Sequence, residues 1–501
     1  MACHSMWRLS FLCGVAAVAA STTLAAGEKP APTYHKDVVR ILQERCQDCH
    51  RPNQVAPFSL LTYEQARKRG SDLAHVTGER IMPPWPASSS FGGPFRDARV
   101  LTDDEIAALQ SWVDAGCPEG DPKEAPAPRT FSSDWALGEP DLTLTMPEPY
   151  HLAATGSDDF RVFVLKTNFP EDRWIRAVDF HAGNRSVVHH IIAGVDPSGR
   201  GRELDAADPG PGYYNLGGFG DGVPIAAFLP IWTPGAKSRY CPDGTGYMLP
   251  KGADILIQVH YHKTGKPETD ATSVGLYLSK KPLPREVHTG FVFPNLTIRQ
   301  ALAARAKVEE AQKVGKRIGI LELFREVDAM VIPAGSPHYE VKASTRPGAN
   351  LMARPLDRDI LITSVMPHMH WLGKDFTFTA VLPDGKTRIP LIKIDHWNFN
   401  WQGTYAFKEP IRVPKGSWFE VDAHFDNSDT NPANQNKPPK LVRWGEGTND
   451  EMCIGIYEWV VVEGEPEPER RRGRGLRVGA PTVNKGQGTT KGTERRTTKG
   501  E

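Results

Sequence analysis

Short runs of alternating apolar and polar residues recur along the chain from about residue 137 to residue 463. The clearest runs are DLTLTM, FRVFVLKT, ADILIQVHYH, DILITSVMPHMH, WFEVDAHF and CIGIYEWVVV, with Pro, Gly, Asn and Asp between them. Successive side chains of a strand point to opposite faces of a sheet, so this alternation predicts strands. Many short strands separated by turn residues are typical of β-sandwiches, and 46 glycines and 43 prolines suit such a loop-rich protein.

Segments of other kinds flank or interrupt these strands. Residues 298–326 are rich in helix formers, and we expect a helical insertion there between two β domains, at 137–297 and 327–463. Residues 30–120 have helical periodicity in HKDVVRILQERC and in LTDDEIAALQSWVDAG. The Pro-rich residues 121–136 are expected to form a linker.

The second of the N-terminal helical patterns has clear end signals. Thr102 and Glu105 have the spacing of a capping box, in which each side chain accepts a hydrogen bond from the other residue's backbone N–H. Gly116 follows the last apolar position and is expected to end the helix.

The two ends of the sequence differ from the rest in composition. Arg8, the apolar run LSFLCGVAAVAA and the small residues STTLAAG predict a signal peptide over residues 1–26, rather than a buried N-terminal helix. Residues 464–501 have almost nothing apolar, which predicts a disordered tail. No later stretch has the roughly 18 consecutive apolar residues of a membrane span. We therefore expect a periplasmic or secreted protein without a membrane span.

The motif CQDCH, at residues 46–50, is the most specific one in the sequence. At the end of a helix, Cys46 and Cys49 supply two thiols that add to the vinyl groups of haem, and His50 supplies an iron ligand. A zinc ribbon would need a second cysteine pair, and a redox disulfide would leave His50 without a role. The motif predicts one covalently bound haem c in a small all-α cytochrome c domain at residues 30–120.

The second axial ligand of such a haem should be a soft donor further along the chain. Met82, in ERIMPPWP, is the only methionine between the haem motif and the linker, and the prolines after it restrict the backbone. His75 is the alternative ligand and would lower the reduction potential. A methionine that merely fills the core is the other interpretation of Met82.

Three histidine clusters lie within the predicted strands. His189 and His190 are neighbours in NRSVVHHIIAGV, whereas VHYH and PHMH each place two histidines two residues apart. Histidines two apart share one face of a strand and can bind one metal ion. A single pair is more often an ordinary core or surface feature. Together, and followed by DEMC at residues 450–453, the clusters form an ordered set across both β regions.

That ordered set resembles the copper type II, ascorbate-dependent monooxygenases, the family that includes dopamine β-monooxygenase and the peptidylglycine α-hydroxylating enzyme. The resemblance covers about residues 137–463 and rests on six ligand positions with their short flanks. It implies two jelly-roll-like antiparallel sandwiches and two copper ions per chain. It also implies an enzyme that uses O2 to hydroxylate a C–H bond of a small organic substrate, with electrons from an ascorbate-like reductant or a redox protein.

The resemblance also implies which residues bind each copper ion. The all-histidine set is His189, His190 and His260; the mixed set is His368, His370 and Met452. Three imidazoles suit a copper that transfers electrons, whereas two imidazoles and a thioether favour Cu(I), which can react with O2. His262 has no counterpart among the ligands and is expected beside the site or exposed. We expect the attached haem to supply or relay electrons to the all-histidine copper.

Some positions depart from the family pattern. The peptide-amidating relatives bind the substrate carboxylate through an arginine two residues before the H-x-H pair and a tyrosine four residues after the methionine. This chain has Met366 and Ile456 there, so a less polar substrate than a peptidyl-glycine is expected. Animal members are rich in disulfides; here Cys453 is expected to pair with Cys241, leaving Cys117 unpaired.

His189 and His190 raise a geometrical problem, because neighbours on a regular strand point to opposite faces of the sheet. We therefore predict a bulge or a strand end at VHH, with at least one ring binding through the nitrogen nearer the backbone. A straight strand with the two rings on opposite faces would rule out the three-histidine site.

Two other functions fit parts of the sequence. A haem–copper electron-transfer protein without oxygenase activity would carry the same ligands but no open substrate site at Met452. A carbohydrate- or protein-binding sandwich with incidental histidines would fold without metal. No nucleic-acid partner is expected, because 60 basic and 60 acidic residues give a formal net charge of zero.

Overall fold

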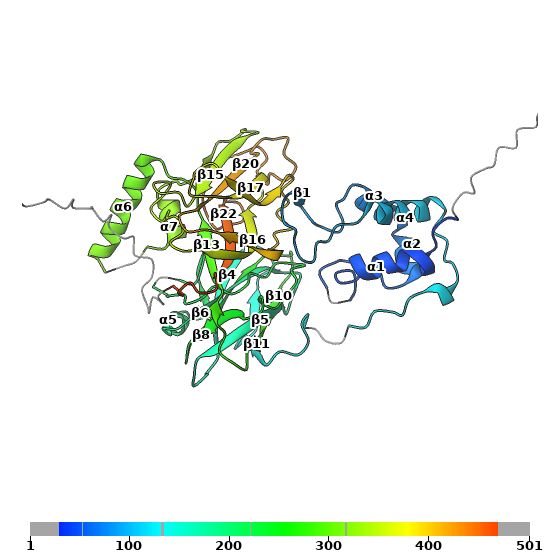
Figure 1. Cartoon of the computed structure of the whole chain (residues 1–501), viewed down its shortest axis with the longest axis horizontal. Coiled ribbons are helices and arrows are strands. Elements are labelled where there is room, and N and C mark those ends of the chain that lie inside the picture. The colour runs from blue at the N-terminus through cyan, green and yellow to red at the C-terminus, as the bar shows by residue number, and fades with distance from the viewer. Residues whose placement is uncertain (1–29, 53, 132–134, 221, 316–317, 469–501) are drawn as a thin grey trace, which may run out of the picture.

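The computed structural model describes residues 30–52, 54–131, 135–220, 222–315 and 318–468. A helical unit and two β units follow one another along the chain (Figure 1). Within the described residues, no helix has the length and apolar character needed to cross a bilayer. The signal peptide expected at residues 1–26 and most of the tail expected at 464–501 lie outside the described residues.

The N-terminal unit is helical, as the periodicity predicts. Its elements are η1 (Tyr34–Val38), α1 (Val39–Arg45), α2 (Tyr63–Lys68), α3 (Gly70–Gly78), α4 (Asp103–Asp114) and η2 (Pro122–Glu124). Leu42 and Trp112 are fully buried in a core that belongs to this unit alone. The capping box of Thr102 and Glu105 is confirmed at the start of α4, and Gly116 follows its end with a φ of 80°.

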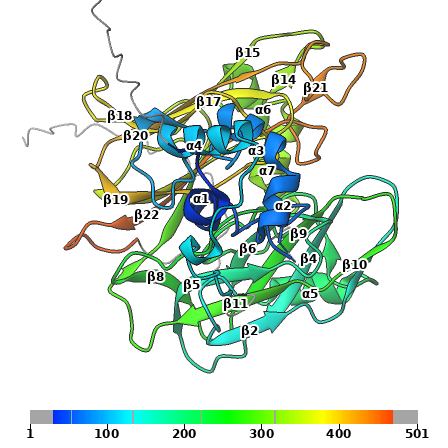
Figure 2. The same cartoon turned by 90° about the vertical axis from the view of Figure 1, so that its right-hand side faces the viewer.

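One strand in this region is not indicated by the sequence. β1 (Ala87–Gly92) pairs with β18 (Arg388–Ile394) at the edge of a sheet in the C-terminal β unit. Trp85 and Phe95, on either side of β1, pack against Tyr405, with ring centroids 5.0 and 5.4 Å away. The helical unit is thereby joined to the β unit that is more distant in sequence. In Figure 2 it lies in front of both β units, near their junction.

The first β unit contains a five-stranded sheet, β12-β8-β5-β11-β2, and a four-stranded sheet, β6-β9-β4-β7, with a small β10-β3 ladder. Apolar side chains of both sheets form one core, with Val178 and Val274 from the first sheet and Ile191 and Ile257 from the second. Its elements are β2 (Leu142–Thr145), β3 (Tyr150–Leu152), β4 (Asp159–Lys166), β5 (Arg173–His181), β6 (Val188–Asp196), α5 (Arg200–Ala207), β7 (Tyr213–Tyr214), β8 (Thr245–Leu249), β9 (Asp254–Tyr261), β10 (Glu268–Asp270), β11 (Ser273–Leu278) and β12 (Arg285–Glu286).

The second β unit is built in the same way. Its sheets are β1-β18-β17-β20-β15 and β13-β22-β16-β19, with a small β14-β21 ladder. Phe378 and Phe419 from the first sheet and Ile362 and Tyr457 from the second share one core. Its remaining elements are β13 (His288–Val292), α6 (Ile298–Lys313), α7 (Ile320–Glu326), β14 (Val331–Ile332), β15 (Tyr339–Ser344), β16 (Ile360–Met369), β17 (Gly373–Val381), β19 (Tyr405–Val413), β20 (Trp418–Phe425), β21 (Val442–Arg443) and β22 (Cys453–Val461).

The mainly β architecture agrees with two β-sandwich domains, and the helices α6 and α7 fall within the insertion expected at residues 298–326. Residues 288–292, which the sequence groups with the first β domain, form β13 and pair with β22 of the second unit. Alternation identifies a strand but not its partner, since the pairing depends on where the chain crosses between sheets.

Candidate functional site

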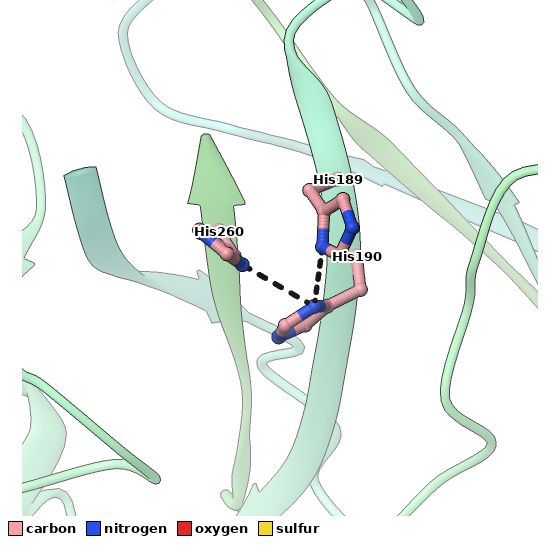
Figure 3. Close-up of side chains that lie close together, drawn as sticks. All are labelled: His189, His190 and His260. Carbon is pink, nitrogen blue, oxygen red and sulfur yellow. Dashed lines mark hydrogen bonds between the residues drawn. The ribbon is translucent and has the colours of Figure 1, made fainter. Parts of the chain in front are cut away.

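Three histidines from two neighbouring strands form a compact cluster in the first β unit (Figure 3). His189 and His190 lie on β6, and His260 faces them from β9. The Nδ1 atom of His190 lies 3.1 Å from Nδ1 of His189 and 3.4 Å from Nδ1 of His260. Nitrogen ligands bind a first-row metal ion such as zinc at about 2 Å, so three Nδ1 atoms this close can surround one ion.

β6 is bulged at this cluster. Val188 pairs with Tyr261 and His190 pairs with His260, which leaves His189 as the extra residue of β6. A bulge sets two residues opposite one and changes the direction of a side chain, so both rings reach the same side of the sheet. The distortion predicted at VHH is confirmed, and the nitrogens nearer the backbone are the ones that face one another.

The cluster is electrostatically suited to bind a metal cation. Burial, with the neighbouring His260 adding to it, lowers the pKa of His189 to about 3. Burial also holds the pKa of His190 well below its usual range. Both rings are therefore neutral near pH 7, and a metal ion would not have to displace a proton from either of them.

A carboxylate orients the third ring. Nε2 of His260 lies 2.8 Å from Oδ2 of Asp158, and Asp158 also accepts a hydrogen bond from the hydroxyl of Thr448 in the second β unit. Burial would raise the pKa of Asp158, but the hydrogen bonds from His260 and Thr448 outweigh it and hold that pKa well below its usual range. This contact holds the His260 tautomer in which Nδ1 has a free lone pair. His262 is 62 % exposed and reaches the same carboxylate at 3.3 Å, so it lies beside the cluster.

The other predicted ligands meet in the second β unit, where β16 and β22 run antiparallel. Met369 pairs with Cys453, so His370 and Met452 occupy the next step of the register. The ring centroids of His368 and His370 are 5.2 Å apart, and the ring planes are nearly perpendicular. His368, His370 and Met452 all line one cavity. Their role as ligands stays a prediction.

Both imidazoles of this second set are held in one tautomer. Nδ1 of His368 donates to the side-chain oxygen of Gln402 at 2.6 Å, and Nδ1 of His370 donates to the carbonyl of Asp450 at 2.9 Å. Burial lowers the pKa of His368 to about 4, although the bond to Gln402 opposes it, and holds that of His370 well below its usual range. Both Nε2 atoms therefore carry a lone pair for a metal ion.

Glu451 ties together the two chain segments of this set. Its side chain is fully buried and accepts hydrogen bonds from the backbone N–H groups of His370 (2.9 Å), Leu372 (2.5 Å) and Met452 (3.3 Å). Burial raises the pKa of this carboxyl to about 8. Its place beside Met452 in DEMC was visible in the sequence, but nothing there indicated that it spans the two strands.

Replacing Glu451 with alanine is expected to destabilise the copper-free protein by about 3 kcal/mol, because buried N–H groups left without an acceptor cost about 1–3 kcal/mol each. Denaturant unfolding of the copper-free chain measures this change. Glu409→Ala is the matched control, because Glu409 is exposed on β19, and it should change the free energy of unfolding by less than about 0.5 kcal/mol. Equal effects of the two substitutions would contradict the positioning role.

One aromatic ring contacts both histidine sets. Phe399 stacks on His189, with centroids 4.8 Å apart and planes 19° apart, and lies 5.8 Å from the ring of His370. The two sets are thus neighbours across the junction of the β units. The sequence did not indicate Phe399, because it belongs to a loop with no recognisable motif.

A cavity of about 960 Å³ lies between the two β units. His190 and the whole second set reach its wall. Met366 and Ile456, the two positions that depart from the family pattern, line it on the same face of the β16–β22 pair as His368. Arg239 and Glu458 give another part of the wall a polar character.

The haem motif forms a tight turn after α1. The N–H of His50 bonds the carbonyl of Cys46 at 2.9 Å, and the thiols of Cys46 and Cys49 are half-buried and free. Nδ1 of His50 lies 3.2 Å from the carbonyl of Phe58, which leaves Nε2 for a metal. The two thiols and this imidazole are the groups that a covalent haem needs, and haem attachment itself stays a prediction. Met82 is half-buried and His75 is exposed on α3, and the choice between them as axial ligand stays a prediction.

The expected disulfide between Cys241 and Cys453 does not form, since both are free thiols, as is Cys117. Cys241 lines the cavity between the β units. Cys453 is fully buried and alternates with Met452, so it points into the core of the second β unit instead. Alternation along β22 therefore keeps the two sulfur atoms on different sides of the sheet.

Each β unit carries a pair of histidines that burial keeps neutral near pH 7, and both pairs lie beside the shared cavity. Imidazole donors of this kind suit copper. Residues 316–460 match the family model described as the copper type II ascorbate-dependent monooxygenase, C-terminal domain. The match covers less than a third of the chain; for that part it supports a copper monooxygenase domain, and with it an oxidoreductase that uses copper.

Other comparisons add no assignment. No curated protein matches the sequence significantly. The subviral particle protein VP2 of infectious bursal disease virus is 7% identical over 64% of this chain and 72% of that chain, with a TM-score of 0.18. The major capsid protein P2 of bacteriophage PM2 is 8% identical over 64% of this chain and 97% of that chain, with a TM-score of 0.23. Likenesses this low carry no argument about fold or function.

Proposed function

We propose that the protein hydroxylates a C–H bond of a small, mainly apolar organic molecule with O2, and that its electrons arrive through a haem bound at Cys46 and Cys49. The strongest support is the convergence of both predicted ligand sets on the two sides of Phe399, with one cavity open to both. Copper bound by these sets would supply one-electron transfer and O2 activation.

The surrounding side chains have separate tasks in this proposal. Gln402 and the Asp450 carbonyl hold the second histidine pair in the tautomer that can bind metal. Met366 and Ile456 bind apolar substrate surface next to that pair and keep water away from it. Phe399 contacts a ring of each set beside the shared cavity, so electrons can cross one ring between the sets.

The packing of the haem motif supports an electron route to the all-histidine set. Asp48, inside CQDCH, forms an ion pair with Lys237 of the first β unit at 3.0 Å. Lys237 follows closely on Trp232, whose backbone exchanges two 2.9 Å hydrogen bonds with Ile191, the neighbour of His190. A haem attached beside Asp48 would therefore lie against the segment that flanks this histidine set. Export to the periplasm or medium is part of the proposal and rests on the sequence of residues 1–26 alone.

Metal analysis and oxygen uptake test this function. The exported protein is expected to contain two copper ions and one haem per chain, and to consume O2 with ascorbate only when an alkylbenzene or alkylphenol is present. His260→Ala should lose one copper ion, whereas His262→Ala, on the same segment but exposed, should keep both. Full copper content without substrate-dependent uptake under any reductant would instead support an electron-transfer protein.

A further inference from the structure

The cavity wall formed by β16 and β22 is organised as three successive cross-strand pairs. In order they are His368 with Ile454, Met366 with Ile456, and Ser364 with Glu458. All six side chains line the cavity. The first pair carries a predicted metal ligand, the second is apolar and the third is polar. Strands rise about 3.3 Å per residue, so the third pair lies about 13 Å from the first.

Two side chains from the first β unit join the polar third pair. Tyr247 donates its hydroxyl hydrogen to Oε1 of Glu458, and Ser364 donates to Oε2 at 2.6 Å. Arg239 lies at the same end of the cavity, where one of its N–H groups donates to the carbonyl of Thr404 at 3.4 Å. We call Arg239, Tyr247, Ser364 and Glu458 the polar pole.

The polar pole has unused hydrogen-bonding capacity. Nη1 of Arg239 is buried and has no hydrogen-bond partner among the described residues. A buried donor without a partner costs free energy, so such a group indicates a missing acceptor. Glu458 accepts one bond on each carboxylate oxygen and can accept more. A bound molecule can therefore both accept from Arg239 and donate to Glu458.

The charges of the polar pole disfavour a bound molecule that carries a net charge. Burial lowers the pKa of Arg239 while the negative charge of Glu458 opposes that shift, so the two charges are close enough to interact. Arg96 and Asp97 also lie within electrostatic range of Arg239, so two positive and two negative charges balance here. A further anion or cation would face a like charge in a partly buried site.

We propose that the polar pole anchors the substrate through a neutral group that is both acceptor and donor, such as a phenol hydroxyl or a primary amide. The rest of the molecule is elongated and apolar, and it runs past Met366 and Ile456 so that its far end reaches the second histidine set. Arg239 and Glu458 thereby determine specificity without contacting the reacting atoms. Which end of the substrate reacts rests on the proposed function, whereas the choice of the anchoring group does not.

Binding to the copper-loaded full-length protein without reductant tests the anchor. Three probes share a phenyl ring joined to a six-carbon chain: 4-hexylphenol, hexylbenzene and 6-phenylhexanoate, whose last chain carbon is the anionic carboxylate. By calorimetry, the phenol is expected to bind about tenfold more tightly than hexylbenzene, as one hydrogen bond to a charged group allows. The carboxylate should bind no more tightly than hexylbenzene.

Two substitutions make the test specific. Arg239→Met should reduce the advantage of the phenol to less than about twofold. Arg96→Met is the matched control, because Arg96 is an exposed arginine on the same cavity, and it should keep the tenfold advantage. Glu458→Gln leaves the charge of Arg239 unbalanced, so this variant should bind 6-phenylhexanoate about tenfold more tightly than the wild type does. That gain cannot come from misfolding.

Equal binding of hexylbenzene and the phenol by the wild type would overturn the proposal, as would tightest binding of the carboxylate. An Arg239→Met variant that still favours the phenol tenfold would also overturn it. These measurements are independent of turnover. If the binding pattern is as expected but there is no O2 uptake, the anchor is supported and the oxygenase function is contradicted. If there is O2 uptake without the binding pattern, the oxygenase function is supported and the anchor is contradicted.

Discussion

Met452→Ala is expected to lower substrate-dependent O2 uptake by a factor of at least about 100. Substituting a residue that only orients a metal ligand already costs about 10–100-fold in metal affinity or activity, and Met452 is expected to be a ligand itself. In the proposed function, the thioether is the soft donor of the second set and would favour Cu(I) over Cu(II). Without it, His368 and His370 alone would bind the ion. Copper content should fall toward one ion per chain, while the all-histidine set keeps its own.

A core control separates this chemistry from loss of packing, because removing a buried methionine side chain costs about 2–5 kcal/mol by itself. Met330 is 2% exposed and Met452 is 4% exposed, and both belong to the core of the second β unit. Met330→Ala should lower the melting temperature similarly and keep both copper ions and the uptake. Unchanged uptake in Met452→Ala with full copper would show that Met452 is not a ligand.

Replacing both Cys46 and Cys49 with alanine is expected to remove covalent haem completely, because the two thioether bonds need both thiols. The visible spectrum of the denatured protein after acid–acetone extraction measures covalent attachment. Cys117→Ala is the control, since this thiol is buried outside the motif in the same helical unit. Haem that stays with the chain in the double variant would contradict the role of CQDCH.

The same variant tests the electron route. In the wild type, anaerobic reduction of the haem should be followed by loss of the Cu(II) signal of the all-histidine set in the electron paramagnetic resonance spectrum. In the double variant, the same electron donor should reduce copper far more slowly. The haem is missing there, and it is the first redox centre on the proposed route past Asp48 and Trp232. A wild-type haem that stays reduced beside oxidised copper would exclude the relay.

Local patterns in the sequence predicted the local structure well. The capping box of Thr102 and Glu105 begins α4, and the alternating runs are strands. These features depend on residues within a few positions of one another, whose spacing directly reflects a period of 3.6 or 2. The bulge at His189 was predictable for a further reason, since two neighbouring residues that are expected to bind one ion cannot both do so from a regular strand.

The groups that complete the site could not be predicted in the same way. Gln402 orients His368 across 34 residues of sequence, and Asp158 orients His260 across 102. Phe399 lies between the histidine sets, and Arg239 faces Glu458 across the junction of the β units. None of them belongs to a motif, because each acts through the position of a distant segment.

The sequence by itself determined the strand periodicity, the CQDCH motif and the order of the histidine pairs, since each depends on short-range spacing. Only the tertiary structure decided that β1 would join the sheet of the second β unit and that Cys241 and Cys453 would stay apart. It also decided that both histidine sets would share a cavity with a polar end. Sheet pairing and domain packing follow from the burial of whole faces, a property of the assembled chain that no single segment encodes.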